Sequence, residues 1–165
     1  MESDRSSNEP IESIEPMTRF YLDAMLGSLV TYLRMCGYDA AYALDEGVEP
    51  DEAILGRIRE EGRTLVTRDR DLAGRAPDAI LLTTREVTDQ LQELADAGFE
   101  LSLPATPERC SNCNGVVVAV DPDASTPDYA PDAADRDVWR CPDCGQHFWR
   151  GSHWDDVAET LARIE

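Results

Sequence analysis

Residues 63–71 read Arg-Thr-Leu-Val-Thr-Arg-Asp-Arg-Asp, a short apolar run that ends in two aspartates. Gly62 precedes the run, and the side chains of residues 63–67 are typical of a buried strand. Asp69 and Asp71 then fall where this strand ends. Because reactive groups in open α/β sheets collect at the carboxyl ends of the strands, the stretch predicts carboxylates at one edge of a sheet.

The flanking sequence extends this pattern in both directions. Apolar runs predict further strands at residues 19–22, 38–44 and 79–83, and helical spacing predicts helices over residues 25–37, 51–62 and 86–97. Strands and helices thus alternate through residue 97, which indicates a parallel sheet covered by helices on both faces. We therefore expect an α/β domain over residues 18–104.

Two CxxC pairs follow this domain. The ligand set that they offer is Cys110, Cys113, Cys141 and Cys144. Four thiolates in two tight turns match a closed tetrahedral zinc site. A redox CxxC pair and two disulfides are the alternatives. A redox pair usually stands alone at a strand-to-helix junction, and disulfides would fit a secreted chain, yet no secretory signal is evident. We expect structural zinc.

Short β segments surround the cysteines, at residues 116–120, 137–140 and 147–150, which is the pattern of a zinc ribbon. A helix over residues 154–164 closes the chain, so residues 105–165 form the second predicted unit. Residues 121–137 contain six aspartates and three prolines and predict an exposed loop. Residues 1–17 are polar and acidic, and we expect a disordered leader. No apolar run is long enough to span a bilayer, and we expect a cytoplasmic protein.

The charge is strongly negative. The chain has 34 acidic residues and 15 basic ones, for a net charge of −19, and every basic residue is arginine. The excess is spread over the chain. A basic partner is one explanation, but we favour the surface of a halophilic protein, which carboxylates keep hydrated at molar salt. Nucleic-acid binding would then depend on local arginines, stacking and metal ions.

Four aspartates are candidates for a second metal site: Asp23, Asp51, Asp69 and Asp71. Asp23 follows the first predicted strand, and Asp51 begins the helix that leads into the third. Four carboxylates gathered at one edge of the sheet would repel one another unless a cation lay among them. Mg²⁺ and Mn²⁺ take such ligands. The alternatives are ordinary surface positions and, for Asp51, a helix N-cap. Asp45 is a weaker fifth candidate.

The sequence also resembles a known family. The stretches that carry the likeness are residues 23–39, 61–72, 109–115, 141–145 and 149–154. In this order they are similar to the Mut-seven C-terminal family of PIN-like ribonucleases, over roughly residues 19–155. The resemblance implies a PIN-like nuclease domain with an appended zinc ribbon. It also implies metal-dependent RNA cleavage, with catalytic acids at Asp23, Asp51, Asp69 and Asp71.

We therefore predict a Mg²⁺- or Mn²⁺-dependent ribonuclease that acts on single-stranded RNA. The alternative is a non-catalytic adaptor that binds RNA or protein through its ribbon. Arg34 and Arg68 flank the acids and would either hold phosphates or neutralise the carboxylates. Trp149 and Trp154 would either stack on bases or form the ribbon's core, and the second role is favoured. His153 is a weaker candidate for a catalytic role.

Overall fold

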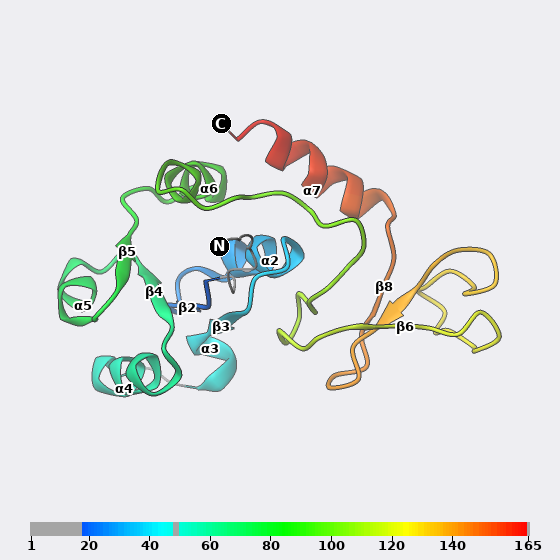
Figure 1. Cartoon of the computed structure of the whole chain (residues 1–165), viewed down its shortest axis with the longest axis horizontal. Helices are drawn as coiled ribbons and strands as arrows, with labels where there is room; N and C mark the ends of the chain where they lie inside the picture. Colours follow the sequence, from blue (N-terminus) through cyan, green and yellow to red (C-terminus); the bar gives the residue numbers. More distant parts are fainter. Residues whose placement is uncertain (1–17, 48–49, 165) are drawn as a thin grey trace, which may run out of the picture.

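The computed structural model describes residues 18–47 and 50–164 (Figure 1). The leader predicted for residues 1–17 lies outside this range. The first part of the chain contains β2 (Phe20–Leu22), α2 (Gly27–Met35), β3 (Ala40–Tyr42), α3 (Ala43–Glu46), α4 (Asp51–Glu61), β4 (Thr64–Thr67), α5 (Arg70–Arg75), β5 (Ala79–Leu81) and α6 (Val87–Asp96). The second part contains β6 (Val118–Ala119), β7 (Trp139–Arg140), β8 (His147–Phe148) and α7 (Ser152–Ala162). None of the described helices has the length and apolar character needed to cross a membrane.

The four strands of the first part form one parallel sheet, in the order β3-β2-β4-β5. Phe20 pairs with Ala40 on one side and with Thr64 on the other, so β2 lies between β3 and β4. The chain first winds from β2 to β3 and then returns past β2 to β4. The gap between the ends of β2 and β4 is therefore the point where the winding reverses, which is where open α/β sheets bind ligands.

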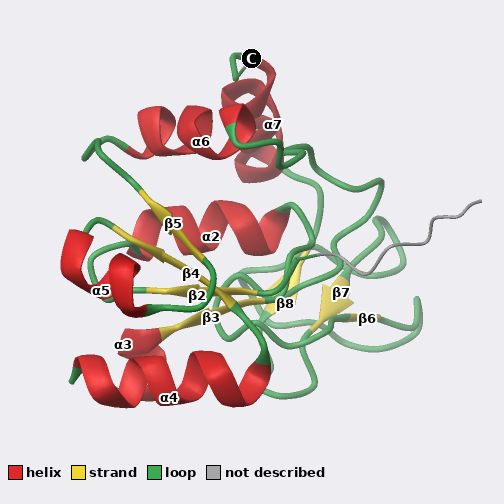
Figure 2. Cartoon of the chain, turned by 60° about the vertical axis from the view of Figure 1, so that its left-hand side comes forward, coloured by secondary structure: helices red, strands yellow, loops and turns green. Residues whose placement is uncertain are grey.

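Helices cover both faces of this sheet, as the alternating pattern predicts (Figure 2). On one face, Phe20, Leu22 and Val66 pack with residues of α2, α6 and α7. On the other face, Tyr21 and Leu65 pack with residues of α4 and α5. Successive strand residues point to opposite faces, and all three residues of β2 are fully buried. A strand buried on both faces explains why the predicted strands are continuously apolar.

The structure differs from the predicted elements at several places. The run over residues 38–44 is a strand only through Tyr42; residues 43–46 turn into α3, which ends at Gly47 with φ +67°. Helix α5 was not predicted at all. The closing helix α7 begins at Ser152, two residues before its expected start.

The second part is a small antiparallel sheet, β6-β7-β8, beside the two cysteine pairs. Its strands have two residues each. Cys110, Val117 and Cys141 form its buried centre, with Trp139 and Phe148 packed against them. This is the ribbon-like unit that the sequence predicts. Helix α7 leaves the ribbon and returns to the larger domain, where its Val157 and Leu161 join the core to which α2 and α6 contribute.

The ribbon docks on the edge strand of the sheet. β3 has an unpaired edge, and there the side chain of Asn114 accepts a hydrogen bond from the Ala40 backbone N–H at 2.9 Å. Asn114 also donates to Asp39 Oδ1 at 2.7 Å. Its φ of +76° is one that asparagine tolerates better than most residues. Asn114 therefore completes the sheet edge and fixes the ribbon to it.

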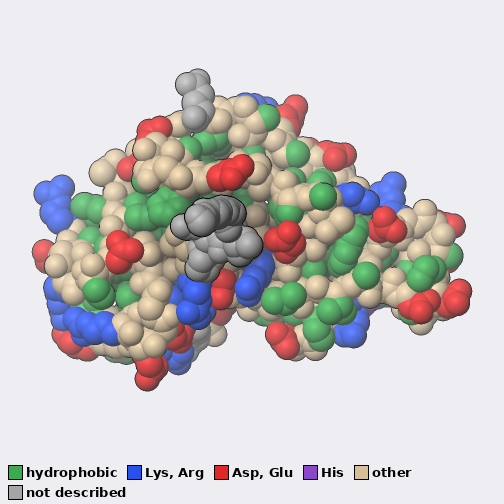
Figure 3. All heavy atoms as spheres, in the orientation of Figure 1, with side chains coloured by type: hydrophobic (Ala, Val, Ile, Leu, Met, Phe, Trp, Pro, Cys, Tyr) green, Lys and Arg blue, Asp and Glu red, His purple; other side chains and the backbone are tan. Residues whose placement is uncertain are grey.

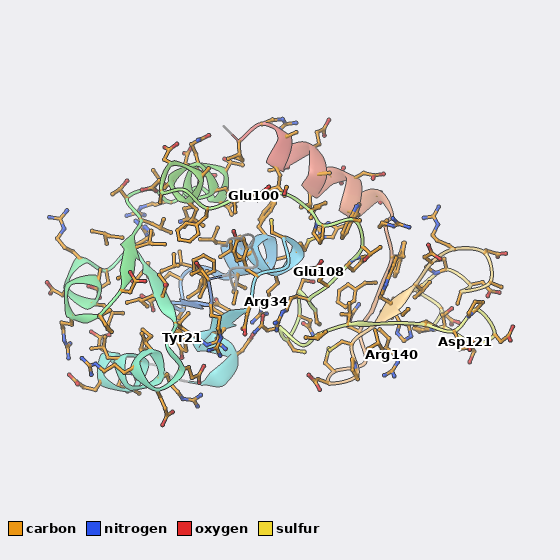
Figure 4. The ribbon with its side chains drawn as sticks, in the orientation of Figure 1. Tyr21, Arg34, Glu100, Glu108, Asp121 and Arg140 are labelled. Atoms are coloured by element: carbon orange, nitrogen blue, oxygen red, sulfur yellow. The ribbon has the colours of Figure 1, made fainter. Side chains whose placement is uncertain are left out.

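Two arginines strengthen the same junction. Arg34 is buried; it donates to Ala40 O within the domain and to Ser111 O in the first cysteine turn. Arg109 donates to Asn114 O and lies 3.9 Å from Asp39. Figure 4 shows Arg34 and Glu108 where the two parts meet, whereas Asp121 and Arg140 lie out in the ribbon. The two parts of the chain thus share a polar, hydrogen-bonded interface.

Asp39 is the common acceptor of this interface. Burial tends to raise its pKa, but hydrogen bonds from Asn114 and Arg63, with the charges of Arg63 and Arg109, hold the pKa below its ordinary value. Arg63 donates to Asp39 at 2.8 Å and to Phe20 O at 3.1 Å. Asp39 is therefore a carboxylate whose charged form the folded state stabilises.

Candidate active site and metal centre

Asp23 and Asp69 lie on either side of the gap between β2 and β4, and Thr67 joins them. Thr67 is fully buried at the end of β4. Its hydroxyl donates to Asp23 Oδ2 at 2.8 Å and accepts from the Asp69 backbone N–H at 3.0 Å. Asp23 is also fixed through its own backbone N–H, which donates to Val66 O. One threonine thus orients the Asp23 carboxylate and links it to the Asp69 backbone.

Asp69 is in addition the N-cap of α5. Its Oδ1 accepts from the backbone N–H groups of Asp71 and Leu72, at 3.0 and 3.2 Å. This bonding satisfies free donors in the first turn of the helix. Asp71 lies in that first turn and is exposed. Asp69 is therefore the cap of a helix and Asp71 lies in the first turn of that helix, so neither residue continues the strand.

Asp51 lies in the first turn of α4 and is half exposed. The residue at the N-cap position is Pro50, and the helix start has no side-chain cap, so the alternative role of Asp51 as an N-cap is wrong. Arg75, in the last turn of α5, approaches Asp51 at 3.9 Å and pairs with Glu52. Asp51 is therefore linked to the helix that Asp69 begins, although it is not bonded to Asp23 or Asp69.

The negative charges of Asp23 and Asp45 act on the side chain of Tyr42. Its hydroxyl donates to Ala24 O at 2.7 Å, next to Asp23. Burial first, and then the negative charges of Asp45 and Asp23, raise the pKa of Tyr42, so the tyrosine stays a protonated donor. Asp45, the weaker fifth candidate, pairs with Arg34 at 3.2 Å. Asp45 is thus neutralised by a buried arginine.

The described residues contain one group of three or more acidic, cysteine or histidine side chains whose ligand atoms all lie within 4.8 Å of one another, and it consists of the cysteines. The four aspartates do not form such a group. Mg²⁺ keeps several waters and often binds through one or two carboxylates, so a hydrated ion does not need all four acids. Asp23 and Asp69 each have more acceptor positions than their protein partners fill, and each could contribute one ligand.

The four cysteines form a compact cluster. The Sγ atoms of Cys110 and Cys144 are 3.6 Å apart, and those of Cys113 and Cys141 are 3.5 Å apart. Disulfide sulfurs would lie about 2.05 Å apart, so the disulfide alternative does not fit. Sulfurs around a tetrahedral zinc ion with bonds of about 2.3 Å would be about 3.8 Å apart. The cluster can therefore hold a metal ion with the geometry of a zinc ribbon.

The pKa values of these thiols differ with their surroundings. Burial raises the pKa of Cys110 and of Cys113 above the ordinary thiol value. At Cys144, hydrogen bonds from the Gln146 backbone and the Asn112 side chain outweigh burial and lower the pKa to about 7. Buried thiolates need a compensating charge, which a divalent cation supplies. Cys36 belongs to the core of the larger domain, where burial raises its pKa to about 12.

Sequence reasoning missed the residues that support the predicted acids. Thr67 and Tyr42 are the last residues of their strands, next to the sheet edge where the acids collect, and this position is the signal that would identify them. Arg68, predicted as a phosphate ligand or counter-charge, has a buried Nε without a hydrogen-bond partner among the described residues. Arg34, the other candidate, bonds inside the fold.

Comparison with known proteins agrees with this architecture. A search of curated proteins and a search of solved structures each found no match. A family model described as the Mut7-C RNAse domain matches residues 18–161, which include the whole sheet, the four cysteines and nearly all of α7. The resemblance seen in the sequence motifs is thereby confirmed. The chain belongs to the Mut7-C RNAse domain family.

Proposed function

We propose that this protein is a metal-dependent ribonuclease that hydrolyses RNA phosphodiester bonds at the edge formed by Asp23, Asp51, Asp69 and Asp71. Membership of a ribonuclease domain family supports an RNA substrate. The observation that carries the proposal is the Asp23–Thr67–Asp69 bridge across the gap between β2 and β4. It fixes two acids at the position where this class of sheet binds ligands.

Each side chain has its own role in this proposal. Thr67 orients Asp23, and the first turn of α5 orients Asp69, so both carboxylates are held before substrate arrives. Asp71 is exposed beside them. Mg²⁺ or Mn²⁺ bound at Asp23 and Asp69 would supply Lewis-acid stabilisation of the charge that develops on the phosphate oxygens. Asp51 has no hydrogen bond to Asp23 or Asp69, and in this proposal it acts through a water molecule.

The proposed substrate is single-stranded RNA, and the proposed ion of the cysteine cluster is zinc. The acidic surface makes broad attraction of a phosphate backbone weak (Figure 3 shows groups of acidic side chains scattered over the visible face, with arginines among them). We propose that the protein is halophilic and cytoplasmic and that screening at molar salt removes this repulsion. Base contacts and the metal ion then contribute more to binding than phosphate contacts do.

The test compares Asp69→Asn with the parent protein. Labelled single-stranded RNA is incubated in molar KCl, with and without Mn²⁺, and cleavage products are separated on a gel. We expect cleavage by the parent only with the metal, and a loss of about 100-fold or more in the variant. Asp128→Asn, which removes an exposed charge in the 121–137 loop, is the matched control and should cut RNA at the parental rate.

The same series of single substitutions ranks the acids. Asp23→Asn should be as damaging as Asp69→Asn, whereas Asp51→Asn and Asp71→Asn should lose less, because Thr67 bridges only Asp23 and Asp69. Equal cleavage by all variants would refute the proposal and indicate a contaminating nuclease. RNA binding without cleavage by the parent would favour the adaptor function. RNA binding is therefore measured separately from cleavage, since the ligand atoms of the four acids do not lie as close together as those of the cysteines.

A further inference from the structure

A pocket of about 460 Å³ lies between α2, the first cysteine turn and the segment that joins β8 to α7. Its walls include Arg109, His147, Phe148, Trp149, His153 and Trp154. The pocket is separate from the acidic edge, since none of the four aspartates lines it. Its volume is in the range of pockets that hold a small ligand or one group of a larger one.

The composition of this pocket differs from that of the chain. Of the 165 residues, 34 are acidic, yet none of the fourteen residues that line the pocket is acidic. The lining includes both histidines and two of the three tryptophans. The pocket lining is therefore free of carboxylates, and an anionic polymer meets no direct repulsion from it.

Trp149 and Trp154 are available to the pocket because the ribbon does not use them as its core. The sequence favours a core role for both, but among the described residues the ribbon's buried centre packs against Trp139 and Phe148. Trp149 is held in place by its neighbours. Its ring lies 6.2 Å from that of Tyr129, and its Nε1 is so near Gly151 that a β-carbon there would be 2.7 Å away. The ring is thus a preformed part of the wall.

The polar groups that line the pocket offer hydrogen-bond donors and acceptors, and few of them have a charge that is free to bind an anion. His147 Nδ1 lies 3.0 Å from Gly145 O; a carbonyl only accepts, so Nδ1 carries the hydrogen and Nε2 of the neutral ring is an acceptor. Asn112 and Gln146 add side-chain amides to the lining. Arg109 is already engaged with Asn114 O and Asp39. Such a site suits a flat, uncharged group with polar edges better than a free phosphate.

We propose that this pocket binds one unpaired base of single-stranded RNA, stacked on Trp154 or Trp149 with its polar edge toward His147. The inference rests on the proposed function for the nature of the ligand, but it concerns a different site. Stacking on aromatic rings is how proteins bind unpaired bases when phosphate contacts are few. In this protein, which has arginine as its only strong base and a net charge of −19, such a contact anchors the strand while the acids act on its backbone.

The experiment measures binding without cleavage. Asp69→Asn protein in molar KCl, without Mn²⁺ or Mg²⁺, is titrated into fluorescein-labelled ten-nucleotide RNAs of adenosine and of uridine, and anisotropy gives the Kd. An abasic ten-mer with the same phosphates and a double-stranded RNA are the ligand controls. We expect the single strands to bind and the abasic ten-mer to bind far more weakly. Trp154→Ala should raise the Kd by roughly 5- to 150-fold, the range for one lost base stack.

Val118→Ala is the matched control, because it removes an exposed apolar side chain from the ribbon, and Val118 does not line this pocket. Metal content and melting temperature are recorded for each variant, and His147→Ala repeats the test if Trp154→Ala is unstable. The inference is overturned if the abasic ten-mer binds as well as RNA, if the parent binds no RNA, or if the pocket variants bind no worse than Val118→Ala.

The two proposals fail in different ways. Base-dependent binding that Trp154→Ala weakens, together with no cleavage by the Mn²⁺-loaded parent, keeps the pocket and removes the nuclease. Cleavage by the parent that Trp154→Ala leaves unchanged in both KM and kcat keeps the nuclease and removes the pocket.

Discussion

Replacing Thr67 with valine tests the bridge between Asp23 and Asp69 most directly. Valine has nearly the shape of threonine, so the fully buried site at the end of β4 keeps its packing. The change removes one hydroxyl. That hydroxyl donates to Asp23 Oδ2 at 2.8 Å and accepts from the Asp69 N–H at 3.0 Å. Both acids lose a fixed contact while their own side chains stay intact.

The size of the effect follows from these two bonds. A hydrogen bond to a charged group contributes about 1.5–3 kcal/mol, and a buried donor left without an acceptor costs about 1–3 kcal/mol. Asp23 is partly exposed and Asp69 is exposed, so water replaces some of the lost bonding. We expect a net loss of about 1–3 kcal/mol in the free energy of unfolding. For a protein of this size, the melting temperature then falls by about 2–12 °C.

Cleavage should fall further than stability. A displacement of about 1 Å at a reacting group can cost roughly 100-fold in rate, so we expect a loss of about 10- to 100-fold in kcat. The half-saturating Mn²⁺ concentration should rise, because Asp23 is less well oriented. Urea unfolding and Mn²⁺ titrations of RNA cleavage measure the two effects. Thr67→Ser keeps the hydroxyl and should recover most of the activity. If Thr67→Val cuts RNA with the parental rate and metal requirement, the bridge has no part in catalysis.

Two further predictions concern the docked ribbon. The pKa of Asp39 is lowered in the folded state, so its stabilising contribution is present above the ordinary value of 3.8 and is lost as the pH falls through the lower folded pKa. In molar KCl, urea unfolding from pH 6 to pH 2.5 should show a smaller acid-induced loss for Asp39→Asn than for the parent, and Asp128→Asn should behave like the parent; equal slopes would show that Asp39 does not titrate with folding. A chelator that removes the metal from the cysteine cluster should unfold the ribbon and also lower the melting temperature of the sheet, because Asn114 then no longer holds Ala40. A circular dichroism melt with parallel metal analysis measures this, and a sheet transition unchanged by full metal loss would contradict the coupling.

The sequence predicted the elements whose identity depends on their own residues. β2 and β4 are buried on both faces, so their apolar runs identify them. Helix α5 was missed because residues 70–75 supply only Leu72 as a buried anchor and include Gly74. Its start depends on Asp69, whose side chain accepts from two backbone N–H groups. Local pattern could not separate an aspartate that caps a helix from one that binds a metal, and here the same residue is placed to do both.

Some side-chain clusters were predictable from the sequence and others were not. The cysteine site was predictable because two short spacings bring the sulfurs together in pairs, and a four-thiol set has few other uses. The ribbon's dock was not predictable, since Asn114 and Asp39 are 75 residues apart and neither motif shows that the two residues pair. The arrangement of the aspartates was only partly predictable, for a related reason. Strand order places Asp23 beside Asp69, but the position of Asp51 depends on how α4 packs and on its contact with Arg75.

The dock also relates the pocket to the acidic edge. Ser111 lines the pocket, and its carbonyl accepts from Arg34, which in turn pairs with Asp45. Asp45 and Asp23 both act on Tyr42 through their charges. Because Arg34 is buried and bonded on both sides, the ribbon cannot move relative to α3 without breaking its contacts. A base held in the pocket would therefore be fixed in relation to the edge that carries Asp23 and Asp69, which is the requirement for an anchor that positions a strand for cleavage.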